Sequence, residues 1–229
     1  IKDWLSSFLS LLFPRCCVVC GRPLAKGEEC ICTVCNINLP RTNYHLRKDN
    51  PVERLFWGQI PLERATSFFF YEKGSDFRLI LHRLKYGGQK EIGAIMGRYM
   101  AAELLSSNFF QGIDVIIPIP LHKKKQQIRG YNQSEWIARG IAVVTGIPID
   151  TESILRKKNT ETQTRKSVFE RRDNVEGIFE LQHPETLAGK HILIVDDVLT
   201  TGSTTLACAS CLVDVEDIRI SILTLAMVE

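Results

Sequence analysis

Asp196 and Asp197 are adjacent carboxylates that follow an apolar run and precede a hydroxyl-rich turn, in the segment ILIVDDVLTTGSTT. Ionised carboxylates only accept hydrogen bonds, so they suit the hydroxyl groups of a ligand. If the turn leads into a helix N-terminus, its backbone N–H groups and the helix dipole favour a phosphate. Together these features predict a sugar-phosphate site, with phosphate contacts from Leu199, Thr200, Thr201, Gly202, Ser203 and Thr204.

Two familiar nucleotide motifs do not explain this segment. The sequence contains neither Gly-x-x-x-x-Gly-Lys-[Ser/Thr] nor Gly-x-Gly-x-x-Gly, which excludes a P-loop and a Rossmann fingerprint. Two alternatives remain. The strand could imitate the second motif of an ATPase, or the two aspartates could simply cap a buried strand.

Six of the eight cysteines lie between residues 16 and 35. They include two Cys-x-x-Cys pairs, a spacing typical of one structural zinc ion held by four thiolates; the predicted ligands are Cys17, Cys20, Cys32 and Cys35. Gly21 and Asn36 follow the two pairs, and we expect both to adopt a positive φ that closes the turns. Disulfides or free thiols are the alternatives, and spacing alone leaves open a register that uses Cys16 or Cys30.

The remaining pattern alternates strands with helices. Expected strands cover 65–72, 114–121, 153–158, 175–181, 191–197 and 218–226, whereas helices cover 75–107 with a break at Gly87 and Gly88, 132–146 and 203–213. The last helix would bury Cys208 and Cys211 as core cysteines. Residues 39–63 have the composition of a linker. This order predicts an α/β fold, with a mostly parallel sheet flanked by helices and a small N-terminal zinc-binding lobe.

Composition sets limits on the partners. The net charge is only +3, but 11 of the 29 Lys and Arg residues fall within 123–129 and 156–172. That clustering suits either a polyanionic ligand or a solvated basic surface. Apolar residues within 5–13 are too few to span a bilayer and recur at helical spacing. We therefore expect an amphipathic helix there and a cytoplasmic protein.

The segment ILIVDDVLTTGST resembles the thirteen-residue signature of type I phosphoribosyltransferases for phosphoribosyl pyrophosphate (PRPP). Three further segments, CVVCG with CTVC, PIPLHKKKQQIRGYNQ and RKKNTETQTRKSVFERRDNVEGIF, resemble in that order the ComF family of ComFC and GntX type. The resemblance covers nearly the whole chain. It implies a zinc-binding lobe over 1–50, a phosphoribosyltransferase domain over 51–229, and a link to DNA uptake during natural transformation.

The same resemblance implies roles for individual residues. Asp196 and Asp197 would hold the ribose hydroxyls, Thr200 through Thr204 the 5′-phosphate, and Mg²⁺ would bridge the pyrophosphate and ribose oxygens. The loop 121–129 would contact pyrophosphate through His122, Lys123 and Arg129, and 160–174 would close over the site as a lid. Thr200 stands where purine-salvage enzymes have an aspartate, which argues against hypoxanthine or guanine. A hood within 54–74 would choose an acceptor that the sequence does not identify.

Two functions follow from this reading. The first is a PRPP-dependent transferase that uses Mg²⁺. The second is a non-catalytic competence or DNA-processing factor that binds single-stranded DNA or a helicase and keeps the PRPP pocket as a sensor or relic. Four aromatic side chains bear on the choice, because they either stack on bases or pack in the core or the hood, and we expect packing: Tyr44, Phe56, Trp57 and Tyr86.

Overall fold

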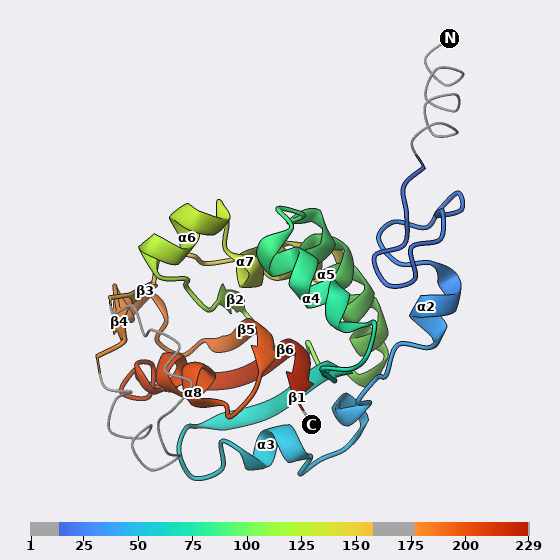
Figure 1. Ribbon diagram of the computed structural model, residues 1–229. Helices are drawn as coiled ribbons and strands as arrows, with labels where there is room; N and C mark the ends of the chain where they lie inside the picture. The colour runs from blue at the N-terminus through green and yellow to red at the C-terminus, as the bar shows by residue number, and fades with distance from the viewer. Residues whose placement is uncertain (1–13, 158–176, 229) are drawn as a thin grey trace.

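The computed structural model describes residues 14–157 and 177–228. Its centre is a four-stranded sheet in the order β1-β6-β5-β2, in which all three strand pairs are parallel (Figure 1). The strands are β1 (Leu62–Tyr71), β2 (Val115–Pro118), β5 (His191–Leu199) and β6 (Arg219–Val228). A separate antiparallel pair joins β3 (Ile154–Arg156) to β4 (Phe179–Leu181). The expected parallel sheet is confirmed.

Five helices of seven or more residues surround the sheet in the described part of the chain: α4 (Arg78–Tyr86), α5 (Glu91–Leu104), α6 (Lys123–Arg129), α7 (Gln133–Thr145) and α8 (Ser203–Ser210). Shorter turns are α2 (Thr33–Ile37), α3 (Pro51–Arg54), η1 (Tyr44–Leu46), η2 (Leu105–Ser107) and η4 (Pro184–Thr186). The predicted break at Gly87 and Gly88 is confirmed, because it separates α4 from α5. Asn132 caps the start of α7 and Gly146, with φ +74°, ends it.

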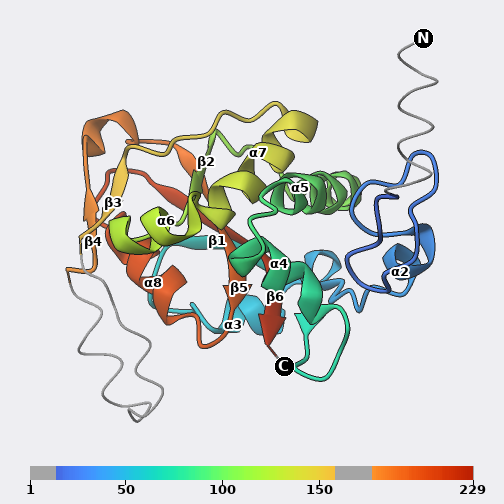
Figure 2. The same cartoon turned by 45° about the horizontal axis from the view of Figure 1, so that its top comes forward.

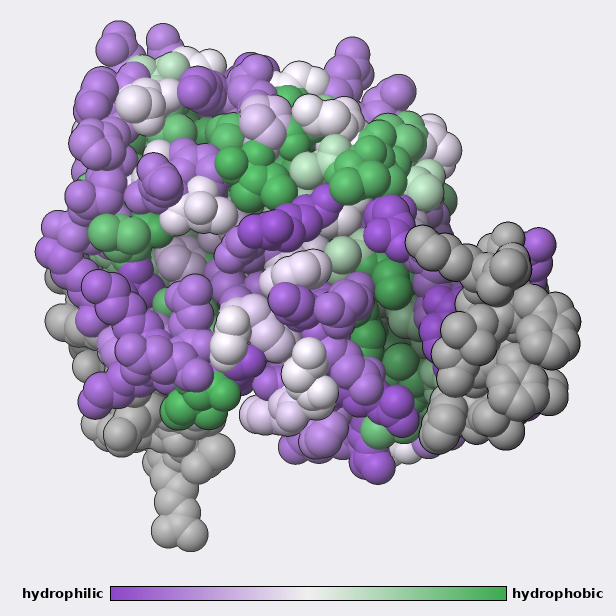
Figure 3. Space-filling view, turned by 90° about the horizontal axis from the view of Figure 1, so that it is seen from above, coloured by the Kyte–Doolittle hydropathy of each residue, from purple (hydrophilic) through white to green (hydrophobic). Residues whose placement is uncertain are grey.

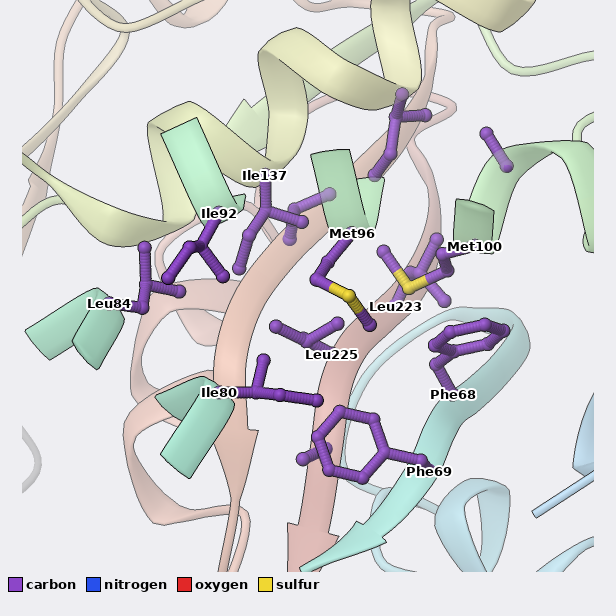
Figure 4. Close-up of a cluster of buried hydrophobic side chains, with 14 of the residues drawn as sticks. Phe68, Phe69, Ile80, Leu84, Ile92, Met96, Met100, Ile137, Leu223 and Leu225 are labelled. Carbon is purple, nitrogen blue, oxygen red and sulfur yellow. The ribbon is translucent and has the colours of Figure 1, made fainter. Parts of the chain in front are cut away.

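The sheet has an apolar cluster on each face. One cluster joins α4, α5 and α7 to β5 and β6, and Figure 4 shows Met96 and Met100 of α5 meeting Leu223 and Leu225 of β6. The other joins α3 and α8 to the opposite face, where Ile192, Ile194, Ile220 and Ile222 lie fully buried. Helices therefore cover both faces, as a parallel sheet requires.

Helices α5 and α7 approach each other closely through glycines and lie side by side in Figure 2. A Cβ atom on Gly97 would lie 2.2 Å from the carbonyl oxygen of Ile137, and one on Gly140 would lie 2.1 Å from that of Ala94. Only glycine permits this distance between the two backbones. This close packing fixes the position of α7 relative to α5. The first turn of α7 lies next to the carboxyl end of β5, where Ser134 contacts Asp196.

The cysteine-rich lobe packs directly against α5. Cys30 Sγ lies 3.9 Å from Met96 Sδ, and Arg98 forms an ion pair with Glu29. Buried lobe residues such as Ile31 belong to the same apolar cluster as α4, α5 and α7. The lobe and the α/β domain therefore share one hydrophobic core.

Several boundaries differ from the sequence prediction. The predicted linker already contains α3, whose capping box pairs Asn50 with Glu53, and its last residues enter β1. Ten residues of the expected hood, 54–74, therefore belong to the strand β1. The predicted loop 121–129 is largely the helix α6, because His122 caps its start and Gly130, with φ +80°, ends it. The N-terminal apolar block and the lid lie outside the described residues. Across 14–157 and 177–228, none of the helices has the length and apolar character to cross a membrane.

Candidate functional site

The two aspartates lie near the carboxyl end of β5, as predicted. Ser134 of α7 donates from Oγ to Asp196 Oδ1 at 3.0 Å, and the backbone N–H of Asp197 donates to the same oxygen at 2.8 Å. Asp197 is 8% exposed, and its Oδ1 lies 3.1 Å from Nζ of Lys85, at the end of α4. The carboxylates are therefore held by two helices that the sequence separates widely.

The two carboxylates have different electrostatic surroundings. Burial, and then the charge of Asp197, raise the pKa of Asp196 to about 7. The N–H of Asp197, the charge of Lys85 and the Ser134 hydroxyl act in the opposite direction, without cancelling the shift. Near neutral pH the Asp196 carboxyl is consequently divided between its protonated and ionised forms.

Further cations gather near this pair. Burial lowers the pKa of Lys125 on α6, and the charges of three other cations lower it further: Arg156, Arg129 and Lys85. Burial also lowers the pKa of Arg156 on β3, whereas the charge of Asp196 raises it. A cluster of positive groups beside two carboxylates suits a polyanion that also carries hydroxyl groups.

The sequence singles out neither Lys85 nor Ser134, and it includes Lys125 and Arg156 only as members of the basic segments 123–129 and 156–172. Lys85 has one weak signal, because it is a basic residue in the last turn of a helix that ends before Gly87 and Gly88. Ser134 follows a helix cap, which indicates local structure and gives no sign of contact with β5. Their proximity to the aspartates comes from the order of the strands.

The hydroxyl-rich turn forms as predicted, but it begins at Thr200, because Leu199 still belongs to β5. Leu199 is the last residue of β5 and is 1% exposed. Gly202, with φ +74°, precedes the first residue of α8, and its backbone packs against the ring of Phe56. Thr200, Thr201 and Thr204 are exposed, whereas Ser203 is half-buried and its Oγ lies 2.8 Å from that of Thr201. The turn thus presents hydroxyl groups and helix-terminal N–H groups together, as an anion requires.

The three residues predicted to contact pyrophosphate lie on or beside α6. His122 accepts from the N–H of Lys124 through Nδ1 at 3.2 Å, which assigns it to capping the helix. Lys123 is exposed, and the Arg129 guanidinium stacks 5.4 Å from the ring centroid of Tyr86. Figure 3 shows the side of the molecule on which α6 lies, where hydrophilic residues are interspersed with apolar patches.

The four predicted zinc ligands converge. The Sγ atoms of Cys17, Cys20, Cys32 and Cys35 all lie within 4.8 Å of one another, so the group could hold a metal ion. The N–H of Cys32 points to Cys17 Sγ at 3.3 Å, as it would to a thiolate. Hydrogen bonds from Arg22 lower the pKa of the Cys20 thiol to about 6. Only thiols within reach of one another provide a tetrahedral thiolate site.

The structure also decides the register among the cysteines. Cys30 is buried against Met96 and Cys16 points its thiol toward the carbonyl of Pro14 at 3.5 Å, so neither belongs to the group of four. Gly21 has the expected positive φ of +73°. The expectation for Asn36 is wrong, because α2 continues through it. Cys208 is fully buried in α8, as predicted.

The prediction that four aromatic residues pack inside is only half right. Phe56 is fully buried, and Tyr44 packs edge-on against Phe70 with ring centroids 5.8 Å apart. Trp57 and Tyr86 are instead 53% and 69% exposed. Each has an arginine over its ring, so both are accessible cation–π pairs.

A separate cavity of about 580 Å³ opens beside the loop 44–50, the first residues of β1 and the segment 107–111. Parallel strands all begin at the same end of a sheet, so this cavity lies at the end opposite the aspartates. Its charged lining includes both signs, among them Arg47, Lys48, Asp49 and Glu63. It is not part of the candidate site.

Comparisons with known proteins identify relatives that match over most of their length, and a more distant structural likeness. No family model matches the chain. The DNA utilization protein YhgH of Escherichia coli O157:H7 is 32% identical over 209 residues, which cover 85% of this chain and 88% of the relative. Competence protein ComFC of Bacillus subtilis is 26% identical over 216 residues, 92% and 83% of the two chains. Adenine phosphoribosyltransferase of Leishmania tarentolae has a TM-score of 0.38 at 12% identity, with 82% and 94% covered, a score too low to support an argument.

Proposed function

The chain belongs to the ComF family, together with YhgH and ComFC, and we propose that it binds PRPP and transfers the phosphoribosyl group to an acceptor. The observation that carries the proposal is the arrangement at the carboxyl end of β5. There, two carboxylates, a hydroxyl-rich turn at a helix N-terminus and a cluster of cations lie together. PRPP carries a matching set of groups, namely ribose hydroxyls, a 5′-phosphate and a pyrophosphate.

Each part of PRPP has a proposed partner. Asp196 and Asp197 accept hydrogen bonds from the ribose hydroxyls, and the turn from Thr200 to Thr204 holds the 5′-phosphate. The cations on α4, α6 and β3 face the pyrophosphate, with His122, Lys123 and Arg129 at its margin. We retain the division of the chain into a lobe over 1–50 and a phosphoribosyltransferase domain over 51–229 as part of this proposal.

Transfer breaks the bond between the anomeric carbon and a pyrophosphate oxygen and forms one from the same carbon to the acceptor. The sugar is cation-like at the transition state, so its charge and that of the leaving group must be stabilised in place. In the proposed complex, Asp196 and Asp197 stabilise the ribose, and the cations stabilise the charge that develops on pyrophosphate. No protein nucleophile is needed.

Two metals complete the proposal. Mg²⁺ prefers oxygen ligands, and when bound it would neutralise charge on the pyrophosphate and ribose oxygens. The residues fit such a cation, because Asp197 already holds an ammonium group at 3.1 Å. Zn²⁺ in the four-cysteine group would be structural, since four thiolates leave no position for water.

Pyrophosphate release tests the transfer reaction. Purified protein would be incubated with PRPP and Mg²⁺ against a panel of acceptors, alongside Asp197→Asn and the control Asp214→Asn, whose carboxylate is exposed on another part of the chain. We expect one acceptor to stimulate release in the wild type and the control, with at least a hundredfold loss in Asp197→Asn. Equal release by Asp197→Asn and the wild type would exclude the assignment.

A second function is favoured by the two exposed cation–π pairs, Arg54 with Trp57 and Arg129 with Tyr86. Exposed rings beside cations are typical of surfaces on which the bases of single-stranded DNA stack. In this function the protein acts on DNA during uptake, with or without turnover of PRPP.

Fluorescence anisotropy with a labelled single-stranded oligonucleotide tests the second function. Binding that weakens steeply with salt and is lost in the Trp57→Ala, Tyr86→Ala double variant would support it. Undetectable binding at 50 mM salt would exclude it.

A further inference from the structure

Lys85 lies beside Asp197, where the proposed function requires a divalent cation. Its Nζ is 3.1 Å from Asp197 Oδ1, and the two side chains are only 20% and 11% exposed. The ligand-free protein therefore supplies a counter-ion to this carboxylate from its own chain. A metal ion that uses Asp197 must displace the lysine or share the carboxylate with it.

The Lys85 ammonium can leave Asp197 while the helix that carries it stays in place. The end of α4 is anchored, because the Tyr131 hydroxyl donates to the carbonyl of Leu84. Beyond Lys85 the helix ends within two residues, at Gly87. The lysine stem has four carbons and many rotamers, and the side chain as a whole is 20% exposed. Rotation of the side chain therefore redirects the charge without a change in the backbone.

An anion bound near α6 would attract this ammonium. Lys85 is close enough to both Asp196 and Lys125 for its charge to affect the pKa of each. Once a divalent cation neutralises the carboxylates, Asp197 attracts the ammonium less strongly. The negative charge that remains on the pyrophosphate then attracts the ammonium instead.

We propose that Lys85 is the resident counter-ion of Asp197 in the ligand-free protein, and that it transfers its ammonium to the pyrophosphate when Mg²⁺ and PRPP bind. The proposal rests on the proposed function for its second half only. No covalent bond changes, since one ion pair is exchanged for two others. Lys85 is then a binding residue whose removal has opposite effects on the metal ion and on PRPP.

Three variants test the exchange. Lys85→Met removes the charge and Lys85→Arg keeps it. The matched control is Lys90→Met, in the segment between α4 and α5, where the lysine ammonium lies 4.7 Å from the ring centroid of Trp136. Thermal unfolding checks that each variant is folded. Mn²⁺ binding without PRPP is measured by electron paramagnetic resonance, and PRPP binding with Mg²⁺ by calorimetry.

The expected results have opposite signs. Lys85→Met should bind Mn²⁺ about fivefold more tightly than the wild type, because a partly exposed ion pair contributes on the order of a factor of five. It should bind PRPP about tenfold more weakly, since one charge-assisted contact is lost. Lys85→Arg should retain most PRPP affinity, and Lys90→Met should match the wild type in both assays.

Each other outcome has a definite meaning. Equal or undetectable Mn²⁺ binding in Lys85→Met and the wild type would overturn the counter-ion role. Tighter Mn²⁺ binding with unchanged PRPP affinity would overturn the transfer to pyrophosphate. If the wild type fails to bind PRPP, the proposed function and the second half of this proposal both fall, while the Mn²⁺ assay still decides the first half.

Discussion

Replacement of Asp196 with asparagine should stabilise the protein at alkaline pH. The pKa of the Asp196 carboxyl is about 7, compared with an ordinary value of 3.8, because desolvation and then the charge of Asp197 disfavour its ionised form. The folded state therefore holds the proton more strongly than the unfolded state. This contribution to stability is fully present below pH 3.8 and is lost as the pH rises through 7. Asparagine keeps the oxygen that accepts from Ser134 and carries no charge.

The magnitude follows from the size of the shift. A difference of about three pKa units, at ~1.4 kcal/mol per unit, gives an upper bound of ~4 kcal/mol. The side chain is only partly buried, and the charges of Asp197 and Lys85 also act on it. We therefore expect a gain in the free energy of unfolding of about half the upper bound, ~2 kcal/mol, at pH 8. At pH 5 the wild-type carboxyl is largely protonated in the folded state, so the gain should fall below ~1 kcal/mol.

Urea unfolding at pH 5 and pH 8 measures both values in the same variant. Asp214→Asn, at an exposed position, is the control and should change stability at neither pH. A variant that is less stable than the wild type at pH 8 would refute this account of the Asp196 environment. A gain of equal size at both pH values would also refute it, because the effect would then not depend on ionisation.

Three other predictions concern the core, the lobe and the ligand. Gly97→Ala should lower the free energy of unfolding in urea by ~2 kcal/mol, because its Cβ would overlap a backbone oxygen of α7. Gly74→Ala has open space around its Cβ and should match the wild type. Equal stability of the two variants would contradict the close packing of α5 against α7. Cys20→Ser should lose bound zinc in elemental analysis and Cys16→Ser should keep it, so a wild type that contains no metal would contradict the thiolate site. PRPP affinity should fall between pH 8 and pH 6 as Asp196 takes up a proton, and calorimetry at the two pH values would contradict this if the affinity were constant.

The sequence predicted best where a local pattern determines geometry. Asp196 and Asp197 follow a buried apolar run, and this pattern correctly predicted that they lie near the carboxyl end of a strand. Likewise, the Cys-x-x-Cys spacing identified four thiols that do converge. The basic segment before Gly130 was interpreted as a loop, although its Lys, Gln and Arg residues are good helix formers and the glycine is a common helix end.

Contacts between distant segments could not be predicted in this way. Ser134 reaches Asp196 across 62 residues, and Lys85 reaches Asp197 from a helix that precedes β2. Both contacts depend on the strand order β1-β6-β5-β2, which the alternation of strands and helices does not specify. The choice of four cysteines out of six also depends on a contact between distant segments. Cys30 is excluded from the thiol group because it packs against Met96 on α5.

Calorimetric titration of PRPP into the protein, with and without Mg²⁺ and repeated for Asp197→Ala, tests the central claim most directly. We expect binding that depends on Mg²⁺ and is lost in the variant, while thermal unfolding shows that the variant still folds. Undetectable binding to the wild type with Mg²⁺, or unchanged affinity in Asp197→Ala, would contradict the assignment of this site to PRPP.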